Sequence, residues 1–267
     1  MSRFTAVGLF LLFFGSVAFG QGQDDGNMGY SNLPFLPNSR WRLHDIARPQ
    51  PPVVEPGAKT AEAPSDAVIL FDGKDLSQWE DAKGGVPEGV EDGCINILKT
   101  GDLLSRPKFG DCQLHIEWAA PAECDTKKPS WWGNSGIFLM GKYELQVTES
   151  HDNAHKADGL AGAIYGQMPP MVNAARRPGQ WQTYDVVFSA PKFDGEKLLQ
   201  PAYFTVIWNG VLVQYHTACM GSTRFKTMPV YNCYDTTGPI KLQQHGSAVR
   251  FRNIWVRPLD LEAAAAR

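Results

Sequence analysis

The chain has 267 residues, of which 43% are hydrophobic and 20% are charged, and it contains 26 glycines and 19 prolines. This composition is that of a globular protein and excludes a collagen, a coiled coil or a wholly disordered chain. The 25 basic residues are outnumbered by 28 acidic ones, which gives a net charge of -3. Because nucleic-acid binding depends on an excess of basic residues, we expect no nucleic-acid partner.

The first 20 residues have the pattern of a secretory signal peptide. They contain one charged residue, Arg3, and an apolar run over residues 4–19 ends beside the small residues Ala18 and Gly20. The run is shorter than the roughly 20 residues that a membrane-spanning helix needs. We therefore predict cleavage after residue 20, a periplasmic or secreted protein, and no membrane contact after cleavage.

Residues 21–66 are predicted to form a proline-rich arm or linker. Seven prolines fall between residues 21 and 65, where neither a regular helix nor a central strand is expected. Apolar residues such as Phe35 and Trp41 distinguish this arm from a purely solvated tether. We expect its middle part to dock on the following domain in an extended conformation.

Residues 67–258 have the pattern of one antiparallel all-β domain, with short alternating runs separated by turn residues. The strongest local signal is Asn209–Gly210, which follows an alternating run and predicts a hairpin with a type I′ turn. Asn253 interrupts the last alternating run and predicts a β-bulge. Residues 259–267 are expected to be a tail with a frayed helical turn.

Five cysteines are present: Cys94, Cys112, Cys124, Cys219 and Cys233. In an exported protein they allow two disulfides, and proximity in sequence favours Cys94 with Cys112 and Cys219 with Cys233. Reduced core cysteines are the alternative. None of the five lies in a CxxC pair, so the sequence gives no support for a zinc or redox motif.

Strand alternation also predicts where chemistry is located, because residues opposite the core side face water or a ligand. His115 and Glu117 share such a face on one strand, and Glu144 and Gln146 share one on another. Carboxylates and amides pair with sugar hydroxyls, and flat aromatic rings pack on the apolar face of a pyranose. A solvated outer sheet is the alternative interpretation.

Three further segments carry candidate site residues. Trp132 and Asn134 lie in a tight Trp-Gly-Asn-Ser-Gly element, which is either a capped turn or a ligand-binding element. Residues 149–159 gather Glu149, His151, Asp152, His155 and Asp158, which is consistent with a metal site, an acid/base loop or a polar surface loop. His245 is a third candidate base, or a histidine that is satisfied at a strand end.

Short pieces of the sequence form an ordered set over about residues 67–258, namely, by residue number, 71–76 with Trp79, 109–111 leading into 114–117, 134–137, 143–146, 162–165, 179–184, 209–210, 238–243 and 251–254. In these pieces and their order the sequence resembles the 3-keto-disaccharide hydrolase domain family. This resemblance implies a concanavalin A-like (jelly-roll) β-sandwich of two antiparallel sheets with the ligand on the concave sheet. The arm and the loop after residue 150 resemble an elaboration of exported planctomycete members.

The resemblance also implies site residues. Glu117, Asn134, Glu144, Gln146 and Tyr165 occupy polar positions of the family, and Glu149 takes the place of an aspartate that commonly follows the Glu-x-Gln element. The expected substrate is a sugar oxidised at C3, whose ketone acidifies the C2 hydrogen. Removal of that hydrogen, loss of the anomeric substituent and addition of water would then cleave the glycosidic bond.

Roles follow from this hypothesis. His151 or Glu149 is expected to be the base, and Tyr165 or His245 is expected near the leaving group. Glu117, Glu144 and Gln146 are expected to bind hydroxyls or a divalent metal, either Ca²⁺ or a transition metal, and Asn134, Trp132 and Gln243 complete the predicted substrate-binding set. No protein partner is implied. The hypothesis requires the side chains of residues 117, 144 and 146 to converge in one hollow.

Two other functions stay open. A non-catalytic, lectin-like carbohydrate-binding module would use the same fold and the same polar face. A jelly-roll β-glucanase would need a second carboxylate two or four positions along the strand from Glu144, where the sequence has Gln146 and Thr148.

Overall fold

The computed structural model describes residues 31–37, 39–49, 51–59, 61–123, 132–151 and 156–266, so the predicted signal peptide lies outside the described residues. The chain divides into two compact units, Met1–Pro51 with Arg267, and Pro52–Ala266. In the first unit the Arg42 guanidinium lies 3.9 Å from the centre of the Phe35 ring and donates to the carbonyl oxygen of Leu33 at 2.8 Å. Among the described residues, no helix has the length and apolar character needed to cross a membrane.

The second unit is built around an antiparallel sheet of eight strands. Its order is β13-β12-β9-β6-β15-β4-β3, and β1 pairs with β15. The strands are β1 (Val68–Phe71), β3 (Val90–Glu91), β4 (Cys94–Asn96), β6 (Cys112–Ala119), β9 (Gln182–Ser189), β12 (Tyr203–Trp208), β13 (Val211–Ala218) and β15 (Arg250–Pro258). We call this the large sheet.

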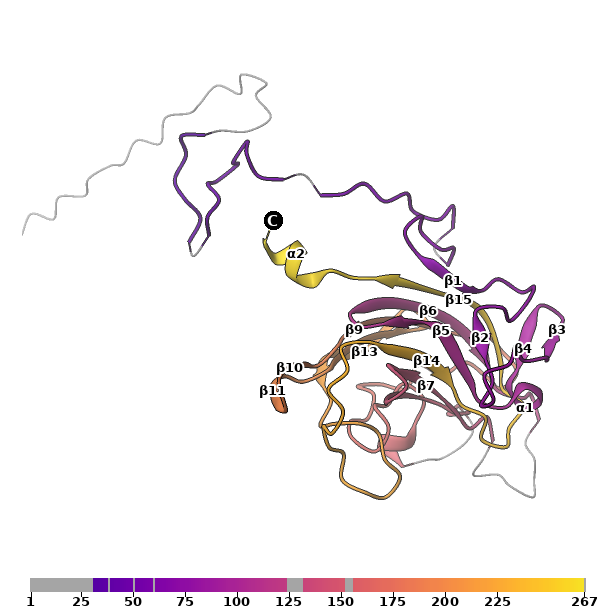
Figure 1. Ribbon diagram of the computed structural model, residues 1–267. Helices are drawn as coiled ribbons and strands as arrows, with labels where there is room; N and C mark the ends of the chain where they lie inside the picture. The colour runs from indigo at the N-terminus through magenta and orange to yellow at the C-terminus, as the bar shows by residue number, and fades with distance from the viewer. Residues whose placement is uncertain are drawn as a thin grey trace, which may run out of the picture. The chain divides into compact units, whose positions relative to one another are not determined.

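A second antiparallel sheet has five strands in the order β2-β5-β14-β7-β8, and we call it the small sheet. Its strands are β2 (Trp79–Glu80), β5 (Leu103–Phe109), β14 (Gly238–Leu242), β7 (Ser135–Leu139) and β8 (Tyr143–Val147). The remaining elements are the hairpin β10 (Lys192–Asp194) and β11 (Lys197–Gln200), the helices α1 (Ile97–Thr100) and α2 (Leu261–Ala266), and a 3-10 turn at Ala157–Gly159. Figure 1 shows the strands as curved layers, with the loop after β13 and the segment after β8 extending away from β6 and β15. The predicted antiparallel β-sandwich is confirmed.

The core between the sheets is rich in aromatic side chains. The ring of Trp118 on β6 lies 5.5 Å from that of Tyr184 on β9 and 6.5 Å from that of Trp208 on β12. Such pairs contribute roughly 0.5–1.5 kcal/mol each beyond the burial of their area. The strands alternate so that these residues face inward, which leaves every second residue to face outward.

The two predictions of local backbone geometry are confirmed. Asn209 and Gly210 join β12 to β13 with φ angles of 52° and 83°, and the Asn209 side-chain oxygen accepts a hydrogen bond from the backbone nitrogen of Thr183 at 2.9 Å. Asn253 has a φ of 46° and lies where the register of β15 against β6 shifts. Left-handed backbone at these positions is the conformation that asparagine and glycine tolerate best.

The predicted disulfides are wrong, because Cys94, Cys112, Cys219 and Cys233 are free thiols. Cys94 lies beside the start of β15, since its neighbour Ile95 pairs with Phe251, whereas Cys112 pairs with Pro258 at the other end of that strand. Cys219 is buried in the core, and Cys233 contacts Lys142 instead. Cys124 lies outside the described residues.

A buried hydrogen bond from Tyr184 links the large sheet to the small sheet. The hydroxyl of Tyr184 on β9 donates to the backbone carbonyl oxygen of Gln146 on β8 at 2.9 Å. Burial raises the pKa of Tyr184 well above its ordinary value, so the hydroxyl stays protonated and remains a donor.

Replacing Tyr184 by Phe should lower the free energy of unfolding by about 1 kcal/mol, because the change removes a buried hydrogen bond but retains the ring. Chemical denaturation would measure the change. Tyr203→Phe, which removes a hydroxyl from the outward-facing side of β12, is the matched control and should stay within about 0.5 kcal/mol of the parent protein. Equal effects of the two substitutions would contradict a structural role for this bond.

Candidate functional site

A cavity of about 980 Å³ lies over the outer face of β7 and β8. Its floor comes from the small sheet, and its walls come from residues 156–166 and 223–229. The cavity size is suited to a small-molecule ligand.

Strand alternation explains the floor. On β8 the side chains of Tyr143, Leu145 and Val147 belong to the core, so Glu144 and Gln146 face the cavity. The same holds for β7, where Phe138 faces the cavity and pairs with Glu144 across the two strands. The Ser135 hydroxyl donates to the carbonyl oxygen of Gln243, and the backbone nitrogen of Gln243 donates to the carbonyl oxygen of Gly136. These bonds join β7 to the chain just after β14 and bring Gln243 to the cavity.

Gly136 on β7 leaves room for the Glu144 carboxyl group. Gly136 pairs with Gln146, and a Cβ atom at this position would lie 2.4 Å from Oε1 of Glu144 and 2.9 Å from the Phe138 ring. At such distances the carboxyl group and the Phe138 ring would have to move, so the absence of a side chain at residue 136 leaves room for the carboxyl group where it lies.

Both walls are attached to β8 through its backbone. The backbone nitrogen of Tyr165 donates to the carbonyl oxygen of Glu144 at 3.2 Å, and the backbone nitrogen of Gln146 donates to the carbonyl oxygen of Ala163 at 2.9 Å. On the other wall, the backbone nitrogen of Glu144 donates to the Thr223 hydroxyl at 3.0 Å. These bonds hold the loops of both walls against the strand that carries Glu144.

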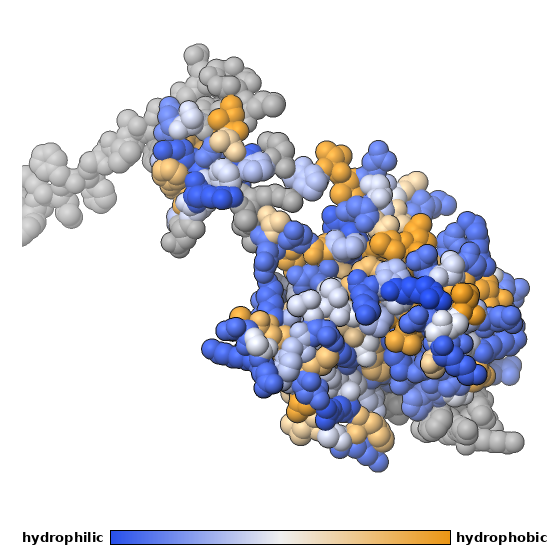
Figure 2. All heavy atoms as spheres, viewed as in Figure 1, coloured by the Kyte–Doolittle hydropathy of each residue, from blue (hydrophilic) through white to orange (hydrophobic). Residues whose placement is uncertain are grey.

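Exposed hydrophobic and basic side chains both occur on the wall formed by residues 223–229. Phe225 and Met228 expose 69% and 75% of their surface, and Arg224 and Lys226 also line the cavity. On the face drawn in Figure 2, hydrophobic and hydrophilic residues are interspersed. The cavity rim therefore offers apolar contacts and positive charge together.

Glu144 is the most strongly perturbed carboxyl group in the cavity. Its side chain is buried, with 5% of its surface exposed, and this burial raises its pKa to about 8 although the charge of Lys241 acts in the opposite direction. The Lys241 ammonium group is held by Asp102 at 2.6 Å. Burial, and then the charges of Glu144 and Asp158, raise the pKa of Tyr165, so its hydroxyl is a proton donor at neutral pH.

Two side-chain amides and a histidine extend from Glu144 along the floor. The Gln146 amide nitrogen donates to Oδ1 of Asn134 at 3.3 Å, and the amide nitrogen of Asn134 lies 3.3 Å from Nδ1 of His245. When the Gln146 amide is turned by 180°, its nitrogen instead donates to Oε1 of Glu144 at 3.2 Å. The floor therefore presents a row of donors and acceptors suited to hydroxyl groups.

The structure brings six of the predicted site residues together in this cavity: Asn134, Glu144, Gln146, Tyr165, Gln243 and His245. It places Glu117, Trp132, Glu149 and His151 elsewhere. The expected convergence of residues 117, 144 and 146 is therefore wrong for residue 117.

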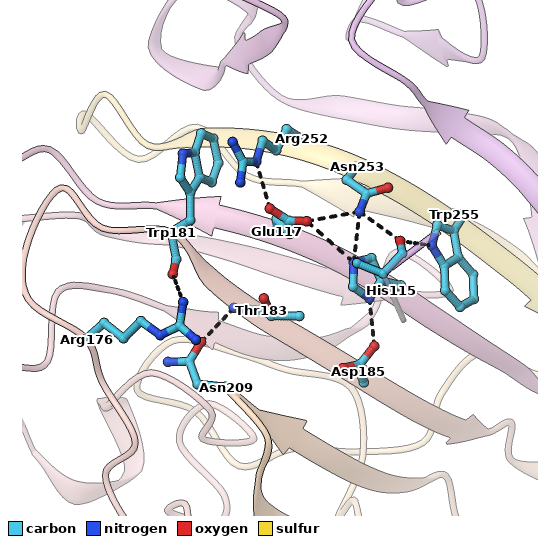
Figure 3. Close-up of polar contacts among 11 residues, drawn as sticks. His115, Glu117, Arg176, Trp181, Thr183, Asp185, Asn209, Arg252, Asn253 and Trp255 are labelled. Carbon is cyan, nitrogen blue, oxygen red and sulfur yellow. Dashed lines mark hydrogen bonds and ion pairs between the residues drawn. The ribbon is translucent and has the colours of Figure 1, made fainter. Parts of the chain in front are cut away.

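Glu117 lies on the outward face of the large sheet, as Figure 3 shows. Its carboxylate accepts from the Arg252 guanidinium at 2.7 Å and from the Asn253 amide at 2.9 Å. Hydrogen bonding to His115 and to these two residues lowers its pKa to about 2 against the opposing effect of burial. Glu117 is thus an ionised carboxylate, paired with Arg252, in a polar cluster on the large sheet.

His115 belongs to the same cluster. Its ring stacks on Trp255 with centres 5.2 Å apart, and Nδ1 lies 2.7 Å from the Asp185 carboxylate. Burial by itself would lower its pKa, but the hydrogen bonds to Asp185 and Glu117 outweigh this effect and raise it to about 9. The amide of Asn253 and the indole nitrogen of Trp255 also donate to the carbonyl oxygen of Ala61, so the cluster fixes the end of the proline-rich arm.

Glu149 and His151 lie outside the cavity because β8 and its alternation end at Val147, and Trp132 lies before the start of β7. The Glu149 carboxylate accepts from the backbone nitrogen of His151 at 2.5 Å and borders a separate space of about 10 Å³ near Trp118. His151 is exposed, and the Trp132 indole donates to the carbonyl oxygen of Pro121 at 2.9 Å. Trp131 and Asp152–His155 lie outside the described residues.

Several cavity residues were missed at the level of sequence. Alternation on β7 would have indicated Phe138, because it lies between the core residues Ile137 and Leu139. No sequence signal indicates Arg224 and Lys226, since they lie on a loop without periodicity and reach the cavity through the topology alone.

Within residues 31–123, 132–151 and 156–266, apart from the masked positions 38, 50 and 60, no three His, Cys, Asp or Glu side chains form a group that could hold a metal. No step below is assigned to a metal ion.

The pKa of Glu144 predicts how its replacement changes stability with pH. A carboxyl group with an ordinary pKa of 4.5 that rises to about 8 on folding stabilises the folded state fully below pH 4.5. This contribution is lost as pH rises toward 8, because the unfolded chain then releases a proton that the folded chain retains. Glu144→Gln should therefore gain stability relative to the parent protein across this interval, as measured by denaturation at several pH values.

Glu196→Gln is the control, since Glu196 is an exposed carboxylate on the turn between β10 and β11. Its measured difference from the parent protein gives the baseline for the effect of removing an exposed carboxylate. A difference for Glu144→Gln that does not change with pH would show that the Glu144 carboxyl is not perturbed.

Known proteins are similar to this chain over its β-sandwich. The family model of the 3-keto-alpha-glucoside-1,2-lyase-like domain matches residues 66–257. A 3-keto-disaccharide hydrolase from Bacteroides thetaiotaomicron is 26% identical over 246 residues, which are 74% of this chain and 81% of that protein.

Solved structures from Parabacteroides distasonis are also similar. One candidate glycosyl hydrolase is 42% identical with a TM-score of 0.74, covering 82% of this chain and 97% of its own. Another is 23% identical with a TM-score of 0.53, covering 73% of this chain and 94% of its own, and supports the fold alone. The chain belongs to the 3-keto-alpha-glucoside-1,2-lyase-like domain family and is a glycoside-cleaving enzyme.

Proposed function

We propose that the protein cleaves the glycosidic bond of 3-keto-glycosides by elimination and hydration, with Glu144 as the base. The observation that carries this proposal is a buried carboxyl group of pKa about 8 on the floor of a cavity lined by amides and a phenol. A general base is most effective when its pKa lies near the working pH. The activity named for the Bacteroides thetaiotaomicron relative supports the same substrate class.

In the first step the Glu144 carboxylate takes the hydrogen at C2, which the neighbouring C3 ketone acidifies. The electron pair of the broken C–H bond forms an enediolate, whose charge needs hydrogen-bond donors in a site shielded from water. The amides of Gln146 and Asn134 provide donors on the cavity floor. Glu144 becomes the neutral acid, which its buried environment favours.

In the second step the bond from C1 to the leaving oxygen breaks, and a 1,2-unsaturated ketone forms. The departing oxygen takes a proton from Tyr165 or His245, both of which line the cavity. Water then adds at C1, and its remaining proton restores Tyr165 or His245. Glu144, whose carboxyl proton exchanges with solvent between the two steps, protonates C2. The sum of these steps is hydrolysis, with release of a 3-keto sugar and an alcohol.

Substrate binding is assigned to the floor and the rim. Gln243 and Asn134 pair with hydroxyl groups, while the Phe138 ring, half-buried beside Lys241, packs on the apolar face of a sugar ring. The rim residues Arg224 and Lys226 contact the part of the substrate that leaves.

Export to the periplasm or the medium remains part of the proposal on the basis of residues 1–20. A requirement for Ca²⁺ or a transition metal also remains a proposal. Activity before and after chelation, and after addition of each ion, would test it.

The activity is tested with an aryl 3-keto-glucoside and the corresponding unoxidised glucoside. Purified protein should release the aryl alcohol from the ketone alone, and in D₂O the sugar product should carry deuterium at C2. Glu144→Gln should lower kcat by roughly 100-fold or more, the effect expected for loss of a general base. In the parent protein kcat should rise with pH toward about 8 as Glu144 ionises.

Glu149→Gln is the comparison for this experiment, because Glu149 lies outside the cavity, and it should keep nearly full activity. Loss of activity in Glu149→Gln with retention in Glu144→Gln would assign the base to residue 149. Binding of the ketone without any turnover would support the lectin-like alternative.

Gly136→Ala should reduce activity strongly while the protein stays folded, because the added methyl group occupies the position of the Glu144 carboxyl. Gly159→Ala is the matched control, since this residue also lines the cavity and its new Cβ atom would meet the Tyr165 ring at an ordinary 3.9 Å. Steady-state kinetics and a melting curve on both variants separate the two effects. Equal activity of both variants would contradict the assigned position of the carboxyl.

A further inference from the structure

Three reactive side chains meet outside the cavity, between the β7–β8 turn and the loop that joins β13 to β14. The ammonium nitrogen of Lys142 lies 2.7 Å from Sγ of Cys233 and 2.8 Å from the Asp235 carboxylate. Sγ of Cys233 is also 2.9 Å from the same carboxylate oxygen. None of these residues has a role in the proposed reaction.

The separation between nitrogen and sulfur is short for a contact of this kind. Charge-assisted hydrogen bonds between nitrogen and oxygen measure about 2.7–2.9 Å, and sulfur is a larger atom than oxygen. A single oxygen atom bonded to both atoms would hold nitrogen and sulfur at about the observed distance of 2.7 Å. The pair is thus already placed for a bridge through one oxygen.

The surroundings allow such a reaction. Cys233 is half-buried and the Lys142 side chain exposes 23% of its surface, so a small oxidant can reach both. Lys142 and Asp235 also border a surface hollow of about 430 Å³. The Asp235 carboxylate accepts from both the ammonium group and the thiol and so holds nitrogen and sulfur together, and the ammonium proton is lost to solvent.

We propose that Lys142 and Cys233 form a covalent Nζ–O–Sγ bridge when the protein meets dioxygen. The thiol and the amine each lose one hydrogen, one oxygen atom joins sulfur to nitrogen, and the other leaves as water with those two hydrogens. Sulfur and nitrogen each give up two electrons, which reduces both atoms of dioxygen. An excess of dithiol reverses the reaction and restores the thiol, the amine and water.

The bridge would connect the start of β8, which forms the cavity floor, with the loop that forms one cavity wall. Lys142 is two residues before Glu144, and its carbonyl oxygen accepts from the backbone nitrogen of Thr223 at 2.9 Å. Cys233 lies on the same loop as the cavity wall at residues 223–229. Oxidation would therefore tie that wall to the strand that carries the buried carboxyl.

The test compares full-length protein kept in aerated buffer with protein reduced by dithiothreitol, both analysed by intact and peptide mass spectrometry. The aerated protein should gain about 14 Da, the mass of one oxygen less two hydrogens, and dithiothreitol should remove this gain. Trypsin should fail to cleave after Lys142 and should yield one branched peptide that contains Lys142 and Cys233.

Lys142→Arg and Cys233→Ser should each abolish the mass gain, and Lys108→Arg should keep it, because Lys108 borders the same hollow but is not in contact with the thiol. Melting curves establish that each variant is folded, and the two independent substitutions keep the test valid if one of them unfolds. Hydrogen exchange in residues 223–229 should slow in the bridged form.

Three results would overturn the proposal. These are an unchanged mass in aerated buffer, a gain that persists in Lys142→Arg, and a disulfide between Cys233 and another cysteine.

Discussion

The alternation of side chains along β8 is the constraint on which the site depends. Tyr143, Leu145 and Val147 are buried in the sandwich core, and this burial fixes the orientation of the strand. A shift of one residue would place Glu144 in the core, where a carboxyl group without partners is very costly. The same contacts that stabilise the fold therefore determine which two side chains face the cavity. The hydroxyl of Tyr184 reinforces this orientation from the opposite sheet.

Glu144 and Glu117 carry the same side chain, but their surroundings shift its pKa in opposite directions and so give it different roles. Glu117 lies among Arg252, Asn253 and His115, which stabilise its negative charge and keep its pKa near 2. Glu144 is more deeply buried, its strongest influence is the loss of water, and its pKa is about 8. A carboxylate of the first kind is a structural ion, whereas one of the second kind can exchange a proton near neutral pH. The contrast explains why the protein can hold one as structure and present the other to a substrate.

Much of the fold and part of the site could be predicted from the sequence. Alternating runs, the Asn209–Gly210 turn and the bulge at Asn253 are local patterns whose backbone geometry follows from short-range sterics. Glu117 was grouped wrongly because alternation says that a residue faces away from the core but not which of the two outer faces it occupies. The wall at residues 223–229 could not be foreseen either, since a loop without periodicity is placed only by long-range topology.

The attachment of the walls to β8 has a second consequence, for the solubility of the protein. β8 is the last strand of the small sheet, and an uncovered last strand presents free backbone groups to other chains. Residues 162–165 occupy those groups with their own backbone hydrogen bonds. A variant lacking this segment would therefore lose more than part of its cavity, because its sheet edge would become a template for strand addition and aggregation.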